Sequence, residues 1–293
     1  MTSLQGKVVL ITGGARGIGA EVARRLRDNG AKLVLTDLDN AALDTIAAEL
    51  GGDEHVLTAV ADVRDLPAMQ AVVEAAVQRF GGLDVAVANA GIASYGSVLQ
   101  VDPEAFKRVL DVNLLGVFHT ARAALPALIE RRGYLLIVSS LAAFAAAPGM
   151  ASYDMSKAGT EHFANALRLE VGYRGVGIGV AHMSWIDTAL VRDTKADLPA
   201  FTTLLKKLPW PLNKTTDVDS CATAFVKGIE GRKDRIYCPG WVVAFRWLKP
   251  VLSTRVGELP IRRTTAELMP QMDAEVAALG RSTSAYNEEL GQA

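Results

Sequence analysis

Residues Val8–Gly19 read VVLITGGARGIG, a short apolar run followed by a glycine-rich turn. The apolar run is typical of a buried strand, and the spacing of Ile18, Val22 and Leu26 predicts a helix that begins in the turn. In such a unit the helix N-terminus offers unpaired N–H groups and positive potential to an anion. The stretch therefore predicts a phosphate-binding turn at the start of an α/β chain.

The alternation of apolar, strand-like runs and helical patterns continues through most of the chain. Successive strand–helix–strand units imply right-handed crossovers. The sequence therefore predicts the α/β class, with a doubly wound parallel sheet of about seven strands and helices on both faces. Strands are expected at 8–12, 33–36, 56–61, 85–88, 134–139, 176–181 and 235–238, and helices after the turn and at 41–50, 66–80, 103–132, 151–173 and 219–228.

Composition excludes several other classes of protein. The chain has 293 residues, enough for one large α/β domain, and its net charge of −1 gives no support to a nucleic-acid partner. Two cysteines cannot form a disulfide framework, so a reduced, cytoplasmic setting is expected. The four histidines lack metal-ligand spacing, and we expect no metal site. The N-terminus lacks the apolar region of a signal peptide, and residues 135–150 are too interrupted to span a membrane.

The pattern loosens in the last third of the chain. Residues 189–217 mix basic residues with prolines and predict a long substrate loop or lid. We expect one nucleotide-binding catalytic domain over 1–240 and a C-terminal extension over 241–293, whose polar end from Thr264 forms a helix with a frayed tail. Residues 241–263 combine apolar with basic side chains. They either pack on the domain or on a partner subunit, or rest on a membrane as a peripheral contact.

Tyr153 and Lys157 stand four residues apart, so a helix would place both side chains on one face. An ammonium group close to a phenol favours the phenolate and lowers its pKa from about 10. The pair is therefore a candidate general acid/base for moving a proton on or off a hydroxyl group. Taken alone, the same spacing also occurs by chance in many helices.

Asp37 closes the second expected strand, where a carboxylate meets the adenosine ribose in a dinucleotide-binding fold. A carboxylate accepts hydrogen bonds from the ribose diol and repels a 2′-phosphate, so NAD is favoured over NADP. Arg16 acts in the opposite direction, because its side chain could reach a 2′-phosphate.

Taken together, these motifs resemble the short-chain dehydrogenase/reductase family over roughly residues 4–240. The family's Thr-Gly-x-x-x-Gly-x-Gly motif matches 12–19, and its Asn-Ala-Gly motif matches 89–91. The remaining matches are Asp62-Val63, Asn113, the Tyr153–Lys157 motif, and Ser140 at the family's usual distance before Tyr153. The resemblance implies a Rossmann-like fold and hydride transfer between a secondary alcohol or ketone and a nicotinamide.

The resemblance also implies a role for each matching residue. Tyr153 would be the general acid/base, Lys157 would lower the Tyr153 pKa and bind the nicotinamide ribose, and Ser140 would hydrogen-bond the substrate oxygen. Asn113 would hold a water that connects Lys157 to solvent. The expected cofactor contacts are Gly13, Ala15, Arg16, Gly17, Ile18, Gly19, Asp37, Asp62, Val63, Asn89, Ala90, Gly91, Tyr153, Lys157, Ile186 and Thr188.

The chain departs from the family pattern after the sixth strand. Met183-Ser184 stands where the family has Pro-Gly, although Ile186 and Thr188 keep the positions that hold the nicotinamide carboxamide. Either the turn is a tolerated variant, or Trp185 reshapes the pocket for a larger apolar ligand.

The loops that supply the substrate contacts in this family are mainly apolar here, with Ser140, Tyr95, Phe144, Met150 and Trp185 as candidates. An apolar alcohol or ketone, such as a lipid, retinoid or steroid-like molecule, is therefore the favoured substrate. The alternatives are an NADPH-dependent carbonyl or ketoacyl reductase, and a family member that binds nucleotide without turnover. We further expect a homodimer or homotetramer.

Overall fold

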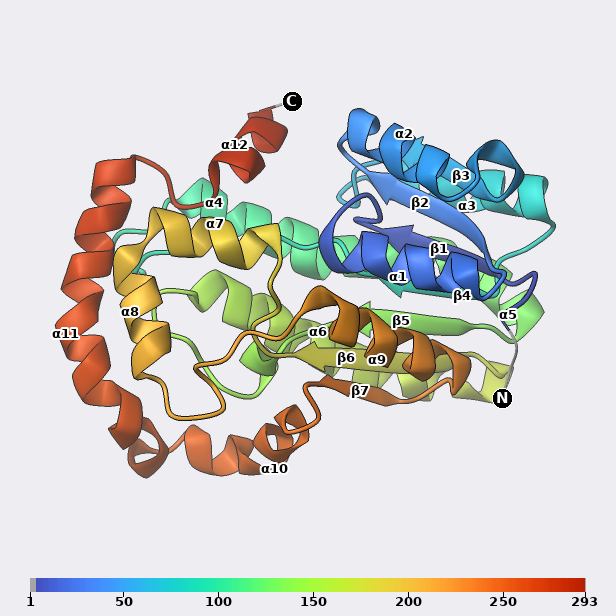
Figure 1. The fold of residues 1–293 in the computed structure, drawn as a ribbon. Coiled ribbons are helices and arrows are strands. Elements are labelled where there is room, and N and C mark those ends of the chain that lie inside the picture. Colours follow the sequence, from blue (N-terminus) through green and yellow to red (C-terminus); the bar gives the residue numbers. More distant parts are fainter. Residues whose placement is uncertain (1–3, 293) are drawn as a thin grey trace.

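Seven parallel strands form the sheet at the centre of the structure, a computed structural model that describes residues 4–292 (Figure 1). The strand order is β3-β2-β1-β4-β5-β6-β7, which confirms the predicted doubly wound sheet. The order reverses between β1 and β4, so a crevice opens there at the carboxyl ends of the strands. The strands are β1 Val8–Thr12, β2 Lys32–Asp37, β3 Val56–Val60, β4 Val85–Ala88, β5 Tyr134–Val138, β6 Gly177–Met183 and β7 Arg235–Cys238.

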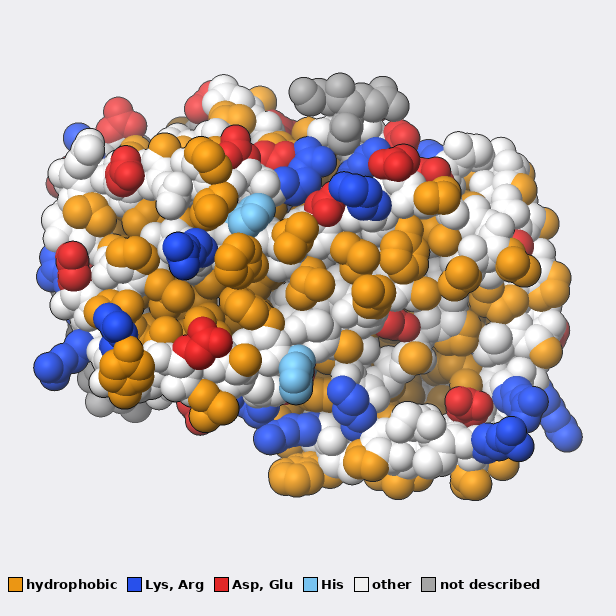
Figure 2. Space-filling model, turned by 180° about the vertical axis from the view of Figure 1, so that it is seen from behind, with side chains coloured by type: hydrophobic (Ala, Val, Ile, Leu, Met, Phe, Trp, Pro, Cys, Tyr) orange, Lys and Arg blue, Asp and Glu red, His pale blue; other side chains and the backbone are white. Residues whose placement is uncertain are grey.

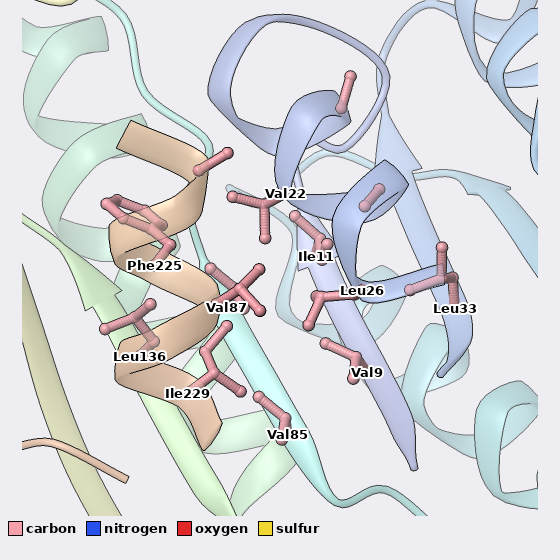
Figure 3. Packing of buried hydrophobic residues seen from close by; sticks show 14 of the residues in the cluster. Val9, Ile11, Val22, Leu26, Leu33, Val85, Val87, Leu136, Phe225 and Ile229 are labelled. Carbon is pink, nitrogen blue, oxygen red and sulfur yellow. The ribbon is translucent and has the colours of Figure 1, made fainter. Parts of the chain in front are cut away.

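Helices cover both faces of the sheet. One face holds α1 (Gly17–Asp28), α2 (Asn40–Glu49) and α9 (Val218–Glu230), and the other holds α3 (Leu66–Phe80), α5 (Gly116–Arg131) and α6 (Ala151–Val171). Figure 3 shows the first face, where side chains of α1 and α9 meet those of the strands. The labelled residues are Val22 and Leu26 of α1, Phe225 and Ile229 of α9, and Val9, Ile11, Leu33, Val85, Val87 and Leu136 of the strands.

The single helix predicted over 103–132 is interrupted. It consists of α4 (Pro103–Leu110), a π-helical turn at Asp111–Leu115 and α5, which ends when Arg132 adopts a left-handed conformation. By length and apolar composition alone, Pro103–Arg131 could cross a membrane, but half of its most apolar window is buried inside the fold. That burial is typical of a core helix.

The prediction of a long loop over 189–217 is wrong for residues 189–207. Residues Ala189–Asp197 form α7 and Pro199–Lys207 form α8, and only the stretch after Lys207 lacks a helix before α9 begins. The helices form because α8 buries Phe201 and Leu204 against α11. The prolines do not oppose these helices, because Pro199 stands at the first turn of α8 and Pro209 and Pro211 lie beyond its end.

The C-terminal segment differs most from the prediction. Helix α10 (Val242–Leu252) is followed by α11 (Arg255–Leu279), which lies along α8 and continues through two prolines (Figure 1). The expected frayed tail is wrong for the described residues, because Ser282, Thr283 and Ser284 are buried and lead into a last helix, α12 (Ala285–Gln292).

Candidate active site

Two adjoining cavities lie beyond the carboxyl ends of the strands. A long cleft runs over β1, β2, β3 and β4, and a smaller apolar pocket lies between β5, β6 and the helices α7 and α8. Tyr153 and Thr188 line both cavities. A reaction at this junction would join a ligand in the cleft to a second ligand in the pocket.

The glycine-rich turn shapes one end of the cleft. Gly13 and Gly17 have φ angles of +61° and +53°, which favour glycine, and a side chain at Gly19 would overlap the carbonyl oxygen of Gly13. Asn89 fixes the turn by donating from Nδ2 to the carbonyl oxygens of Thr12 (2.9 Å) and Gly13 (3.0 Å). The N-terminus of α1 has no side-chain cap, so its N–H groups face the cleft unpaired by a side chain. These features fit a diphosphate.

Asp37 lies in the cleft at the end of β2. Its carboxylate accepts hydrogen bonds from the backbone N–H groups of Leu38 (2.9 Å) and Ala15 (3.3 Å). Burial raises the pKa of Asp37, while these hydrogen bonds and Arg16 oppose that shift. The Arg16 guanidinium forms an ion pair with Asp39 rather than pointing freely into the cleft. The Asp37 carboxylate therefore lines the cleft, whereas Asp39 does not line it and holds Arg16.

Most of the other predicted cofactor residues line the same cleft. The residues that do so are Gly13, Arg16, Gly17, Ile18, Asp37, Asp62, Val63, Asn89, Ala90, Gly91, Tyr153, Lys157 and Thr188. Ala15 and Gly19 shape the turn from behind, and Ile186 lines the apolar pocket instead.

Tyr153 and Lys157 lie on one face of α6, with Lys157 Nζ 5.5 Å from the centre of the Tyr153 ring. Lys157 is buried and donates to the carbonyl oxygen of Val138 at 2.9 Å. Burial raises the pKa of Tyr153 to about 12 and lowers the pKa of Lys157 to about 8. Burial is therefore the dominant influence on the Tyr153 pKa, and the expectation that Lys157 lowers it stays a prediction.

Ser140 lies beside Tyr153 in the pocket wall and follows β5. A side-chain hydrogen bond between them works against the rise in the Tyr153 pKa. The Ser140 hydroxyl also lies 3.4 Å from the carbonyl oxygen of Met183 and caps a short helical turn. The serine is thus held where a substrate oxygen would approach the phenol.

Asn113 is fully buried in the π-helical turn and does not line either cavity. Its Oδ1 accepts from the Ile92 N–H (2.8 Å), and its Nδ2 donates to the Ile92 carbonyl oxygen (2.9 Å) and to Ser156 Oγ (3.1 Å). The side chain therefore fixes the loop after β4, and the expected role of Asn113 in holding a water stays a prediction.

Met150 and Trp185 line the apolar pocket as predicted, and Trp185 stands edge-on to Phe201 of α8 at 5.5 Å. Tyr95 lies outside both cavities, where its hydroxyl donates to Asp197 Oδ2 (2.6 Å). Phe144 is also outside, because its ring stacks on His182 at 4.5 Å. The pocket lining excludes Tyr95 and Phe144 as direct contacts.

Met183-Ser184, which replaces the family's Pro-Gly, has an ordinary backbone. Neither residue has a positive φ angle, and Met183 extends β6 by pairing with Cys238. The Ser184 N–H donates to the Cys238 carbonyl oxygen at 3.0 Å. The family's glycine would offer the same N–H group at this position, so the geometry is compatible with a tolerated variant of the turn.

Several lining residues were not predicted. Asp154 lines the apolar pocket, where its Oδ2 accepts from the Ala147 N–H at 2.7 Å, and burial raises its pKa to about 7. The cleft is also lined by Arg64, Arg108, Ser284, Tyr286, Asn287 and Leu290. Ser284 before a polar helical stretch is a recognisable N-cap, but nothing in the sequence brings α12 back to the cleft. Within residues 4–292, no cluster of three or more His, Cys, Asp or Glu residues could hold a metal ion.

Comparisons with known proteins agree with this geometry. A family model described as short chain dehydrogenase matches residues 7–199. Oxidoreductase UcpA of Salmonella typhimurium is 34% identical over 71% of this chain and 82% of its own. The (-)-trans-carveol dehydrogenase of Rhodococcus erythropolis is 32% identical over 75% of this chain and 90% of its own. A crystal structure of a short chain dehydrogenase/reductase from Burkholderia phymatum in complex with NAD shares the fold, with a TM-score of 0.73 at 23% identity over 84% of this chain and 94% of that one.

Proposed function

The chain belongs to the short-chain dehydrogenase family and is an NAD(P)-dependent oxidoreductase, and from that premise we propose that it interconverts an apolar secondary alcohol and its ketone with NAD. The observation that carries the proposal is the position of Tyr153, which lines both the nucleotide cleft and the apolar pocket. A phenol at that junction can reach a substrate oxygen while a hydride passes between the two cavities.

Each polar residue at the junction has a proposed task. Tyr153 accepts the hydroxyl proton during alcohol oxidation and returns it during ketone reduction. Ser140 donates a hydrogen bond to the substrate oxygen and shares its developing charge. Lys157, held by the Val138 carbonyl, binds the nicotinamide ribose beside the phenol. The nicotinamide, when bound, supplies the hydride chemistry.

An apolar substrate is favoured by the pocket wall. The side chains that close it are mostly aliphatic or aromatic, and the polar exceptions include Ser140, Tyr153 and Asp154. A relative named for carveol, a secondary alcohol, is consistent with this class of substrate. The lipid, retinoid and steroid-like molecules expected from the sequence belong to the same chemical class.

NAD is favoured over NADP because the Asp37 carboxylate lines the cleft at the end of β2, where the ribose would lie. Arg16, the residue that could hold a 2′-phosphate, is paired with Asp39. The Asp37 carboxylate would therefore repel a 2′-phosphate, and Arg16 would have to leave its ion pair with Asp39 to bind one.

The test is a panel of apolar secondary alcohols and small polyols, assayed with NAD and NADP by nicotinamide absorbance. We expect turnover of apolar alcohols with NAD and a loss of at least about 1,000-fold for Tyr153→Phe, because the phenol is the proton path. If folded Tyr153→Phe turns over substrate within a few-fold of the parent rate, Tyr153 is not the general acid/base. If the enzyme prefers small polyols to apolar alcohols, only the proposal of an apolar substrate is contradicted.

We also propose that α10 and the start of α11 contact an anionic membrane surface and so hold a cytoplasmic protein at a source of apolar substrate. Val242 and Phe245 of α10 pack inward, and the outward side combines apolar with basic residues. The exposed apolar residues are Val243, Trp247, Leu248, Val251, Val256 and Leu259, and the basic residues are Arg246, Lys249, Arg255, Arg262 and Arg263. Apolar side chains among cations suit the interface of an anionic bilayer.

Vesicle sedimentation separates this contact from self-association. We expect binding to vesicles that contain phosphatidylserine and weaker binding to neutral ones, with loss of binding in the double variant Trp247→Ala and Lys249→Glu. Lys227→Glu, an exposed change on α9, is the matched control and should leave binding unchanged. If the double variant instead abolishes a concentration-dependent dimer and vesicles are not bound, the surface is an interface between two copies.

A homo-oligomer is proposed through a second apolar surface, formed by the π-helical turn, α5 and α6. Phe118 of α5 lies 6.3 Å from Phe163 of α6, and the neighbouring Leu115, Met155 and Leu169 are exposed. Figure 2 shows hydrophobic side chains gathered on the face of the molecule turned away from the viewer in Figure 1. We expect Phe118→Glu to convert a dimer or tetramer to monomer in analytical ultracentrifugation.

A further inference from the structure

The C-terminal segment returns to the nucleotide cleft after α11 has run along the opposite side of the substrate helices (Figure 1). Three residues of α12 line the cleft: Tyr286, Asn287 and Leu290. They lie about 270 positions along the chain from the glycine-rich turn, which lines the same cavity. Helix α12 is therefore a wall of a cavity whose other walls come mainly from residues 13–193.

A buried anchor holds α12 in this place. Arg281 forms an ion pair with Asp197 of α7, and its guanidinium also donates to the Tyr95 hydroxyl at 2.8 Å. The Ser282 carbonyl oxygen accepts from the Tyr95 N–H (2.8 Å), and the Thr283 hydroxyl donates to the Ala93 carbonyl oxygen (2.9 Å). These bonds tie the residues just before α12 to the loop after β4. The position of α12 is thus fixed by these polar contacts together with those of the helix itself, in which Arg108 donates to the Asn287 carbonyl oxygen at 3.5 Å and lies 3.9 Å from Glu288.

Tyr286 stands at the ribose end of the cleft. The Arg16 guanidinium carbon lies 4.3 Å from the centre of the Tyr286 ring, in a cation–π contact. The Asp37 and Asp39 carboxylates lie close enough to act on the phenol electrostatically. The phenol oxygen is buried and has no hydrogen-bond partner of ordinary geometry within residues 4–292, although the Asp39 carboxylate lies close enough to attract its proton. A buried hydroxyl without a partner beside the ribose-binding carboxylate is a ready hydrogen-bonding group for a ligand.

We propose that α12 is part of the cofactor site and that Tyr286 contacts the adenosine half of the nucleotide, with its ring against the ligand and its hydroxyl hydrogen-bonded to the ribose or diphosphate. This inference rests on the proposed function, because it assumes a dinucleotide in the cleft. Arg16 is then positioned by two partners, Asp39 and Tyr286, and the glycine-rich turn is closed from above by the C-terminal helix.

Titration calorimetry with NAD and with ADP-ribose tests the proposal. We expect Tyr286→Ala to weaken both ligands by about tenfold to a hundredfold and Tyr286→Phe by about threefold to tenfold, because the first change removes the ring and the second only the hydroxyl. Glu289→Ala, an exposed change on the same helix, is the matched control and should stay within about twofold. In steady-state assays the KM for NAD should rise while kcat stays near that of the parent, because α12 does not contact Tyr153.

A chain that ends at Ser284 keeps the anchor and lacks α12, and it should bind both ligands at least as weakly as Tyr286→Ala. Thermal melting checks that each variant is folded. Unchanged affinity in Tyr286→Ala and in the shortened chain overturns the proposal, and tighter binding by the shortened chain overturns it in favour of a helix that blocks the cleft. If the parent chain binds neither NAD nor NADP, the proposed function fails instead, so the two failures are distinguishable.

Discussion

Asp154 places a carboxyl group in the wall of an otherwise apolar pocket, next in sequence to Tyr153. Its Oδ2 accepts one hydrogen bond from the Ala147 N–H, and its Oδ1 is buried without a partner in the described part of the chain. Burial raises its pKa to about 7, so the folded protein holds this group protonated at pH values where the unfolded chain ionises it. The folded state therefore loses stability as pH rises from about 4 to about 7, and the loss is complete above 7.

Replacing Asp154 by Asn should remove this pH dependence. The amide keeps an acceptor for the Ala147 N–H and never ionises, so Asp154→Asn should match the parent near pH 4 and exceed its unfolding free energy by about 2–4 kcal/mol at pH 8. Urea unfolding at pH 4, 6 and 8 measures the difference. Asp53→Asn, on an exposed turn, is the control. If the difference in unfolding free energy between Asp154→Asn and the parent is the same at pH 4 and pH 8, the pKa of Asp154 is not raised by burial.

Asp37 should decide between the two nicotinamide cofactors. Asp37→Ser removes the carboxylate that accepts hydrogen bonds from a ribose diol and repels a 2′-phosphate. We expect NAD affinity to fall by about tenfold to a hundredfold and NADP affinity to rise, as charged hydrogen bonds contribute about 1.5–3 kcal/mol. Paired titrations with both cofactors measure the change. An equal loss for NAD and NADP would mean that Asp37 acts only by holding the turn.

Single residues of the site were predictable where their chemistry depends on a local motif. The glycines and the Tyr153–Lys157 pair depend on spacing along one turn or one helix. The pKa values were not predictable, because they depend on burial by segments that are distant in sequence. Lys157 illustrates this point, because it lies on α6 and its hydrogen-bond acceptor is the Val138 carbonyl oxygen at the end of β5.

At the scale of elements, Asn113 ties the π-helical turn to the loop after β4 and to α6. Three hydrogen bonds from one buried amide join these segments, two to Ile92 and one to Ser156. Such turns inside α-helices occur often at functional sites. Here the turn orients the Asn113 amide toward the backbone of Ile92, which directly follows the Asn-Ala-Gly stretch that lines the cleft.

Asn113→Ala should therefore destabilise the protein as well as weaken nucleotide binding. The change leaves the Ile92 N–H and carbonyl groups unpaired in the interior, which costs about 2–4 kcal/mol of unfolding free energy. Chemical denaturation measures that loss, and NAD titration measures the effect on the cleft. Asn40→Ala, on the exposed start of α2, should change neither. Full stability in Asn113→Ala would show that the loop does not depend on the amide.

Elements were predicted well in the sheet and for α9, and poorly between β6 and α9 and after β7. The strands and their covering helices carry periodic apolar patterns over their whole length, and these patterns are local. Helix α11 contains Pro260 and Pro270, which disfavour a helix interior, yet it forms because Leu268 and Met272 are buried against α8. Only the folded partner shows that this burial is available.

At the scale of the whole molecule, the C-terminal segment is packed on the domain. Removal of 241–293 would expose Phe201 and Leu204 of α8 and take away Leu268 and Met272 of α11. We expect a chain ending at Gly240 to lose about 5 kcal/mol or more, a large share of typical domain stability. Binding of a hydrophobic dye and an early thermal transition would report the loss.

A point variant separates lost packing from lost chain length. Met272→Ala leaves the segment in place and should cost about 2–5 kcal/mol, because Met272 is almost fully buried. Leu99→Ala, at an exposed position in the loop after β4, should cost little. If the shortened chain is as stable as the parent, 1–240 is an independent domain and α11 only rests on it.

The return of α12 to the cleft has a practical consequence for handling the protein. Lys7, just before β1, pairs with Asp84 at the amino ends of the strands, whereas α12 lies beyond their carboxyl ends, beside the cleft (Figure 1). An affinity tag or fluorescent fusion joined after α12 would crowd the mouth of the nucleotide cleft and depress measured affinities. A tag joined ahead of β1 would leave the cleft clear, and immobilisation for binding assays should use that end.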